Sequence, residues 1–262
     1  MKFMAPAKIN LNLSIAGRRA DGYHLLQSDM VFTTWGDEIT ITPSDEFTLT
    51  ADGPYSNIFT ADLLSTDRGA SNLIIRAVYA LIHNRNILPS IHVHVNKVIP
   101  AGAGLGGGSS NAAAVIHALN DYWKLNLSMD ELCAVGLELG AELPACLHAR
   151  PCRVTGIGDI IEPIDVSPMI LLIVWPDAPL LTKDVFGVYE SEVHEVNDLT
   201  DAAISLCPEI GDLISVLQSS KGCVRANMSG SGSACFGVFE NINQAKAAQS
   251  QFKNAIVTTT VI

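Results

Sequence analysis

The stretch "PAGAGLGGGSSNAA" (residues 100–113) holds five glycines and two serines between a strand-like and a helix-like segment. Few side chains stand there, so a ligand can approach the backbone closely. Successive N–H groups that lead into a helix N-terminus bind anions, and the serine hydroxyls can reach a phosphate or a metal ion. A flexible linker is the alternative, but linkers are rarely set between a strand and an Ala-rich helix. The stretch therefore predicts a phosphate-binding loop.

Two other phosphate-binding patterns fit this loop poorly. A Walker A loop needs a lysine directly after its glycines, and none follows here. A dinucleotide fingerprint is formally present at Gly102, Gly104 and Gly107. That fingerprint also needs a second strand that ends in an acidic residue about twenty residues later. The residues that follow, "AAVIHALNDYWKLNL", keep a helical pattern, so the dinucleotide interpretation is weak.

A second candidate for chemistry is a lysine near the N-terminus. The stretch "AKINLNLSIA" (residues 7–16) alternates apolar and polar residues, which predicts a half-buried strand. Lys8 and Asn10 share its polar face. Lys8 is either an oriented functional lysine or an ordinary surface lysine whose stem packs on the sheet. Without further motifs, the second interpretation is the simpler one.

Histidines and cysteines form no convincing site. His92 and His94 share one strand face, but no third metal ligand stands at useful spacing, so two solvent-facing histidines are expected. The six cysteines contain no CxxC pair and predict reduced thiols.

The elements that must position these residues follow from periodicity and capping signals. A turn-rich loop is expected at residues 17–24, and two α+β domains are expected at residues 1–153 and 154–262. Strands are predicted at residues 7–16, 30–34, 38–42, 90–95, 169–175, 235–239 and 255–262. Helices are predicted at residues 71–84, with Ser71 or Asn72 as N-cap, and at 109–123, 128–140, 201–206, 210–219 and 242–252.

Composition bounds the class of protein. The chain of 262 residues is 48% hydrophobic and 16% charged, so it can bury a sizeable core. Its net charge of −11 argues against nucleic-acid binding, and a phosphorylated ligand would need a local positive site. The longest apolar run is too short to span a membrane, and residues 1–10 do not read as a signal peptide. A cytoplasmic protein without a membrane or nucleic-acid partner is therefore expected.

Three stretches together resemble one family. "PAGAGLGGGSSNAA" resembles the second motif of the GHMP kinases, and "MSGSGSACFGVF" (residues 228–239) resembles their C-terminal glycine motif. That motif includes Ser229, Gly230, Ser231 and Gly232. "PAKINLNLSIAGRRADGYHLL" (residues 6–26) narrows the likeness to those members that phosphorylate a cytidine-diphosphate-linked methylerythritol. The resemblance implies a two-domain fold: a ribosomal protein S5 domain 2-like N-terminal domain and a ferredoxin-like α/β-sandwich C-terminal domain.

The resemblance also implies how ATP is bound. The glycine loop would cover the phosphates, Asn72 would lie near the adenine, and Mg²⁺ would be held mainly through the nucleotide and water, without a dedicated protein metal site. The loop residues concerned are Pro100, Ala101, Gly102, Ala103, Gly104, Leu105, Gly106, Gly107, Gly108, Ser109 and Ser110. A small-molecule substrate and ATP are the implied partners, in a monomer or a weak homodimer.

The implied reaction transfers the γ-phosphoryl group of ATP to the 2-hydroxyl of the methylerythritol substrate, in non-mevalonate isoprenoid precursor biosynthesis. Lys8 matches the catalytic lysine beside the attacking hydroxyl. Tyr23 and His24 match the residues that stack on and hydrogen-bond to cytosine, and Phe186 is a candidate for the other side of that stack. Asn10 and Lys97 are expected to contact the erythritol or phosphate portion.

One departure concerns the catalytic carboxylate. Where the family has aspartate in an "LGADVP"-like segment, this chain has "LGAELP", so Glu142 is the candidate. Its extra methylene adds about 1.5 Å of reach, and a misplacement of about 1 Å can cost on the order of 10²-fold in rate. Ala149 replaces a family glycine, and "GIGD" replaces a GxGE pattern. The alternatives are a weakened or non-catalytic relative that binds ATP or substrate, or a GHMP kinase for another small alcohol.

Overall fold

A computed structural model describes residues 1–20, 22, 24–190, 194 and 196–261, and it divides the chain into two compact units. The first unit contains residues 1–7, 36–101 and 106–149, and the second contains residues 8–35, 102–105 and 150–262. The chain enters the last segment close to the predicted boundary at 153. Residues 8–35 nevertheless join the second unit, because strand pairing ties residues 28–30 to residues 152–154. Sequence periodicity does not show which strands pair across such a distance.

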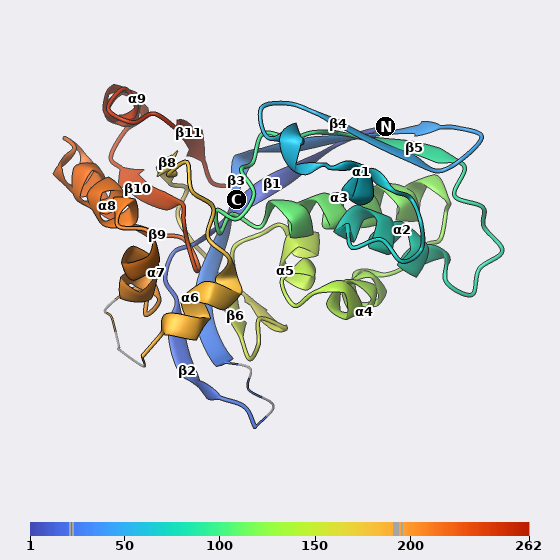
Figure 1. Cartoon of the computed structure of the whole chain (residues 1–262), viewed down its shortest axis with the longest axis horizontal. Coiled ribbons are helices and arrows are strands. Elements are labelled where there is room, and N and C mark those ends of the chain that lie inside the picture. Colours follow the sequence, from blue (N-terminus) through green and yellow to red (C-terminus); the bar gives the residue numbers. More distant parts are fainter. Residues whose placement is uncertain (21, 23, 191–193, 195, 262) are drawn as a thin grey trace. The chain divides into compact units, whose positions relative to one another are not determined.

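In the first unit, strands pair in both parallel and antiparallel directions (Figure 1). The C-terminal half of β3 (His24–Pro43) pairs antiparallel with β5 (Ile91–Asn96), which pairs parallel with β4 (Thr48–Asp52). β1 (Lys2–Asn10) pairs with β3. β5 buries every second residue, as its alternating sequence predicts.

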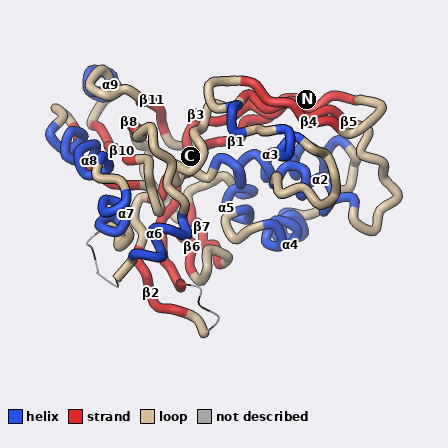
Figure 2. The backbone as a smooth tube through the Cα atoms, viewed as in Figure 1, coloured by secondary structure: helices blue, strands red, loops and turns tan. Residues whose placement is uncertain are grey.

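Helices lie along one side of these strands and supply the rest of the core (Figure 2). They are α1 (Ala61–Leu64), α2 (Leu73–Ile82), α3 (Gly107–Tyr122), α4 (Met129–Leu139) and α5 (Leu143–His148), with a 3₁₀ turn η1 at Ser56–Ile58. Asn72 caps α2, and Ser128 with Glu131 forms the predicted capping box of α4. The short helix α5 was not predicted.

β3 is a single strand of 20 residues, whereas two separate strands were expected. Residues 35–37 separate the two predicted strands in the sequence. Gly36 instead allows a close crossing: a Cβ atom there would lie 2.1 Å from the backbone oxygen of Ala5 on β1. The glycine therefore marks close backbone approach and not a turn.

In the second unit, the N-terminal half of β3 pairs with β2 (Ser14–Arg18) and with β6 (Cys152–Thr155), and β7 (Ile160–Pro163) pairs with β6. The predicted strand at residues 7–16 is interrupted, because β1 ends at Asn10 and β2 begins at Ser14. Gly17 and Arg18 belong to β2 and His24 begins β3, so the expected loop at residues 17–24 is shorter than predicted.

The rest of the second unit is a four-stranded antiparallel sheet in the order β11-β8-β10-β9. Its strands are β8 (Ile170–Val174), β9 (Cys223–Met228), β10 (Cys235–Phe239) and β11 (Ala255–Thr259), and its helices are α6 (Thr182–Val188), α7 (Thr200–Leu206), α8 (Glu209–Ser219) and α9 (Ile242–Gln249). Residues of α7, α8 and α9 share one buried core with β8 and β10. This order of strands and helices is the expected ferredoxin-like arrangement.

Ala149 carries backbone strain at the end of α5. Its φ of 45° and ψ of 36° are left-handed, a conformation that favours glycine at a helix C-terminus. We expect Ala149→Gly to stabilise the first unit by about 1 kcal/mol, which raises the thermal midpoint by about 2–4 °C. Ala134→Gly, at an exposed position inside α4, is the matched control and should destabilise by about 0.5–1 kcal/mol. A lower midpoint for Ala149→Gly would contradict the strain.

Within the described residues, none of the helices combines the length and the apolar character needed to cross a membrane.

Candidate active site: two glycine motifs around Lys8

The two glycine motifs, 125 residues apart in sequence, contact each other in the second unit. The Ser229 hydroxyl donates to the Gly104 carbonyl at 3.1 Å, and the Ala234 N–H donates to the Ala103 carbonyl at 3.0 Å. A Cβ atom at Gly104 would lie only 2.4 Å from the Ser229 carbonyl oxygen. A side chain at Gly104 would therefore collide with the backbone of the C-terminal glycine motif.

Every second residue of the glycine loop from Gly102 to Gly106 has a left-handed backbone. Gly102, Gly104 and Gly106 have φ of 66°, 70° and 65°, whereas the residues between them are not left-handed. Each carbonyl of residues 102–105 accepts a hydrogen bond from a group of the second unit: Leu180 N, Ala234 N, Ser229 Oγ and Lys8 N. Since N–H and C=O point in opposite directions across a trans peptide, the following N–H groups face away from these partners. N–H groups that point away from these contacts are the groups that an anion-binding loop needs.

In the first unit, the loop continues into the N-terminus of α3. No side chain caps this helix in the described structure, so the N–H groups of its first turn remain for an oxyanion. The hydroxyl of Ser110, which is buried, donates to the Pro6 carbonyl at 2.5 Å. The hydroxyl of Ser110 therefore has a structural partner within the first unit.

Lys97 lies beneath this helix start in a buried ion pair. Its ammonium is 2.5 Å from Asp37 Oδ2, and it is 2.8 Å from the position that a Cβ atom of Gly107 would take. Asp37 also accepts from the N–H groups of Val98 and Ile99. Burial lowers the pKa of Lys97, and the Asp37 carboxylate opposes that change. The structure thus gives Lys97 a structural partner, and its contact with substrate stays a prediction.

Lys8 and Asn10 lie against the C-terminal glycine motif in the second unit. The Lys8 ammonium donates to Asn10 Oδ1, and both residues are at least 97% buried, with exposures of 3% and 2%. A Cβ atom at Gly230 would lie 2.9 Å from Asn10 Oδ1 and 3.2 Å from Lys8 Nζ. The Asn10 N–H also donates to Ser229 Oγ at 3.1 Å. The stem of Lys8 is therefore not merely packed on a surface: its charge is held at the glycine motif.

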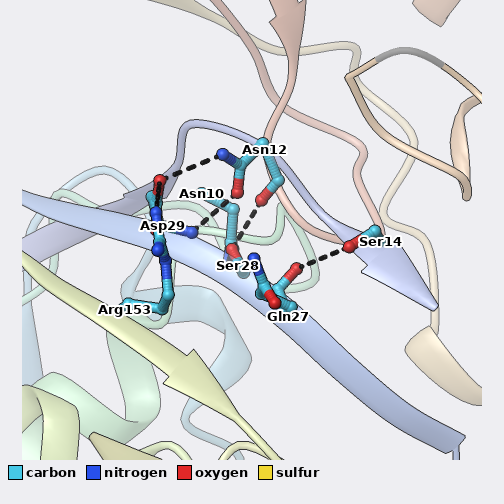
Figure 3. Close-up of polar contacts among 7 residues, drawn as sticks. All are labelled: Asn10, Asn12, Ser14, Gln27, Ser28, Asp29 and Arg153. Carbon is cyan, nitrogen blue, oxygen red and sulfur yellow. Dashed lines mark hydrogen bonds and ion pairs between the residues drawn. The ribbon is translucent and has the colours of Figure 1, made fainter. Parts of the chain in front are cut away.

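A row of hydrogen-bonded polar groups leads from Asn10 through Ser28 and Asn12 to Asp29 and Arg153 (Figure 3). Asn10 Nδ2 donates to Ser28 Oγ at 2.6 Å, and Ser28 Oγ donates to the Asn12 carbonyl at 2.5 Å. Asn12 and Asp29 exchange two hydrogen bonds, and Arg153 binds the Asp29 carboxylate through two nitrogens. Sequence reasoning missed Ser28, Asp29 and Arg153. The one signal was the polar face of residues 8–14.

Two of the three predicted cytosine-binding residues, His24 and Phe186, contact each other. The rings of His24 and Phe186 stack with centroids 4.8 Å apart and an interplanar angle of 21°, and Tyr189 meets His24 edge-on at 6.1 Å. Burial, followed by the Arg18 guanidinium, lowers the pKa of His24. The imidazole is therefore neutral near pH 7 and offers one donor and one acceptor. Tyr23 lies outside the described residues.

The remaining predicted residues have varied contacts. Asn72 uses its side chain locally, since Oδ1 accepts from Ile74 N and Nδ2 donates to the Leu63 carbonyl. Ser231 Oγ lies 3.0 Å from the Thr182 hydroxyl, and Gly232 has a φ of 83°. Glu142 precedes α5 without capping it through its side chain. Because Glu142 belongs to the first unit and Lys8 to the second, their catalytic pairing stays a prediction.

The described residues contain no group of three histidine, cysteine or acidic side chains that could hold a metal ion. His92 and His94 instead share hydrogen bonds with Thr50 on β4.

Comparison with known proteins agrees with this geometry. The family model "GHMP kinases N terminal domain" matches residues 72–150, and "GHMP kinases C terminal" matches residues 188–257. The chain is similar to the 4-diphosphocytidyl-2-C-methyl-D-erythritol kinase of Mesorhizobium japonicum, with 37% identity over 95% of this chain and 90% of that protein. For the Brucella abortus enzyme of that name, the values are 38%, 91% and 86%.

Solved structures agree as well. A crystal structure of 4-(cytidine 5'-diphospho)-2C-methyl-D-erythritol kinase has a TM-score of 0.82 at 29% identity and covers 99% of both chains. The mevalonate kinase of Methanococcus jannaschii shares the fold, with a TM-score of 0.71 at 14% identity over 100% of this chain and 98% of that chain.

The fold and the paired glycine motifs define a GHMP kinase, a small-molecule kinase that uses ATP. The chain belongs to the 4-diphosphocytidyl-2-C-methyl-D-erythritol kinase family. The names of these relatives do not favour the alternatives of a non-catalytic relative or of a kinase for another small alcohol.

Proposed function

We propose that this protein transfers the γ-phosphoryl group of ATP to the 2-hydroxyl of 4-diphosphocytidyl-2-C-methyl-D-erythritol, a step of non-mevalonate isoprenoid precursor biosynthesis. The substrate hydroxyl loses its proton and forms a bond to the γ-phosphorus, the bond from that phosphorus to the β-phosphate oxygen breaks, and ADP leaves. The main support is the position of Lys8, whose ammonium is held by Asn10 beside Gly230 while its backbone N–H binds the glycine loop.

Phosphoryl transfer needs positioning and neutralisation of charge more than covalent chemistry from the protein. The N–H groups of the loop and of the first turn of α3 are suited to the phosphates, and the ammonium of Lys8 supplies positive charge for the reacting oxygens. Mg²⁺, which neutralises phosphate charge in such reactions, would bind through the nucleotide and water, and the hydroxyl of Ser109 is a candidate ligand from this chain. The overall negative charge of the chain makes these local positive groups more important.

The cytidine portion of the substrate would bind at the cluster of aromatic rings formed by His24, Phe186 and Tyr189 in the second unit. The neutral imidazole of His24 can hydrogen-bond to the edge of a base, and the ring of Phe186 can stack on its face. Tyr23 is proposed to stack on the other face of the cytosine base. Homoserine and mevalonate offer no base for such a group, so this feature favours a nucleotide-linked substrate.

A coupled assay of ADP release tests the function. The purified protein with Mg-ATP should release ADP only when 4-diphosphocytidyl-2-C-methyl-D-erythritol is added, and ³¹P NMR should show the new phosphate monoester. Homoserine and mevalonate are the control substrates, and EDTA should stop the reaction. Measurable ATP binding without substrate-dependent ADP release would refute the proposal.

Glu142 is proposed as the catalytic carboxylate that orients the substrate hydroxyl or accepts its proton. Its side chain is one methylene longer than the family aspartate, so we expect Glu142→Asp to raise kcat, by up to about 10²-fold if the present carboxylate is displaced by about 1 Å. Glu142→Gln, which keeps the size and removes the charge, should lower kcat by about 10² or more. A slower Glu142→Asp enzyme would show that this protein has adapted to the longer side chain.

A further inference from the structure

Ser28 carries a buried hydroxyl group that is connected to Lys8 through the side chain of Asn10. It lies on β3 with an exposure of 0%, and its oxygen is 2.6 Å from Asn10 Nδ2 and 2.5 Å from the Asn12 carbonyl (Figure 3). The motif resemblance assigns it no role. Its two contacts nevertheless connect the catalytic lysine to the rest of the second unit.

Counting protons assigns a direction to every bond in this group. The backbone carbonyl of Asn12 can only accept a hydrogen bond, so Ser28 must use its single hydroxyl proton there. The Ser28 oxygen can then only accept from Asn10. Asn10 must therefore turn its NH₂ group toward Ser28 and its carbonyl oxygen toward the Lys8 ammonium, which is a donor without lone pairs.

At the other end of this row of polar groups, Asn12 and Asp29 are held by contacts that do not involve Lys8. Asn12 donates to Asp29 Oδ2 at 3.2 Å and accepts from Asp29 N at 2.7 Å. Asp29 and Arg153 are direct cross-strand partners, and hydrogen bonds from Arg153 keep the pKa of the Asp29 carboxyl below its usual range. The carboxylate thus stays ionised and holds the side chain of Asn12, which lies between the end of β1 and the start of β2.

We propose that Ser28 is a positioning residue for phosphoryl transfer: its hydroxyl fixes the amide of Asn10 so that the amide oxygen faces the ammonium of Lys8. The catalytic part of this inference rests on the proposed function of Lys8. The geometric part, the fixed amide, does not.

Removal of the hydroxyl has a defined consequence. In Ser28→Ala, the Asn10 NH₂ group loses its acceptor inside a buried site, and a buried donor without a partner is costly. The amide then loses one of the two contacts that fix it, and only the Lys8 ammonium still selects its orientation. Lys8 would remain in the chain but lose its fixed direction.

Steady-state kinetics tests the catalytic part. We expect Ser28→Ala to lower kcat by about tenfold or more while KM for both substrates changes by less than about twofold, because orientation is lost and binding is not. Ser28→Thr keeps the hydroxyl and should retain kcat within about threefold. Ser14→Ala is the matched control, since the exposed Ser14 makes one long contact of 3.5 Å to the Gln27 carbonyl, and it should behave as wild type.

NMR of the Asn10 side chain tests the geometric part without any activity. The carboxamide protons of Asn10, assigned with Asn10→Asp, should exchange slowly in wild type and Ser28→Thr, and about tenfold faster in Ser28→Ala. If Ser28→Ala does not fold, Ser28→Cys fills the same space with a weak donor and acceptor and should show the same changes.

Wild-type kcat in Ser28→Ala, or an equal loss of kcat in Ser28→Thr and Ser28→Ala, would overturn the positioning role. Unchanged Asn10 exchange in Ser28→Ala would overturn the fixed amide. A wild-type protein without kinase activity would instead refute the proposed function, and the exchange measurement would still decide the orientation of Asn10.

Discussion

Lys8→Met is expected to lower kcat by about 10²–10³-fold, the usual effect of removing one group that stabilises transition-state charge. Methionine keeps the length and apolar stem of lysine but has no charge, so β1 should keep its packing. The lost ammonium is the group that Asn10 holds beside Gly230. Since we propose that backbone N–H groups of the loop bind the ATP phosphates, the dissociation constant of ATP should change by less than about threefold.

Lys2→Met is the matched control for Lys8→Met. Lys2 stands on the same strand, but its side chain is 68% exposed and pairs with the exposed Glu38. An exposed ion pair contributes little, so this variant should keep wild-type kcat and stability. Single-turnover kinetics with saturating ATP would separate chemistry from product release. A Lys8→Met enzyme with kcat within about threefold of wild type would remove Lys8 from the catalytic residues.

Gly104→Ala is expected to be the most destabilising single-methyl change in the glycine loop. The new Cβ would lie 2.4 Å from the Ser229 carbonyl oxygen and 2.8 Å from that of Gly232, and both are backbone atoms. The left-handed φ of 70° adds strain. We expect a loss of about 3 kcal/mol, from about 1 kcal/mol of backbone strain and 1–3 kcal/mol of overpacking. The thermal midpoint should fall by about 2–4 °C for each kcal/mol, and KM for ATP should rise as the glycine motifs separate.

Gly108→Ala is the matched control for Gly104→Ala, because it also replaces a loop glycine by alanine but without a backbone clash. Gly108 lies in the first turn of α3, and a Cβ atom there would meet only Leu73 Cδ1, at 3.9 Å. Alanine is the better helix former, so this variant should be as stable as wild type or more stable by up to about 1 kcal/mol. Calorimetry of both variants in parallel gives the comparison. Equal stability of Gly104→Ala and Gly108→Ala would contradict the expected clash between a side chain at residue 104 and the C-terminal glycine motif.

Local patterns in the sequence predicted local structure well. The cap at Asn72 and the capping box at Ser128 correspond to observed elements, and the alternation predicted over residues 90–95 corresponds to β5 at 91–96. These features depend on neighbours within one helical turn or one strand, which the sequence displays directly. The short helix α5 and the continuous strand β3 were missed. Gly36 signals a turn by its type, yet its actual role comes from Ala5, 31 residues earlier.

From the sequence by itself, glycine spacing predicted a phosphate loop, and the resemblance of three short stretches to one family implied the class of kinase and the candidate lysine. All of these are short-range patterns that the sequence displays directly. Only the tertiary structure decided what holds these parts. It brought Ser229 to Gly104 and Gly230 to Lys8, and it buried Lys97 on Asp37. It also placed Ser28 between Asn10 and Asn12. The orientation of a buried amide or ammonium depends on every donor and acceptor around it, and those partners come from strands that the sequence keeps far apart.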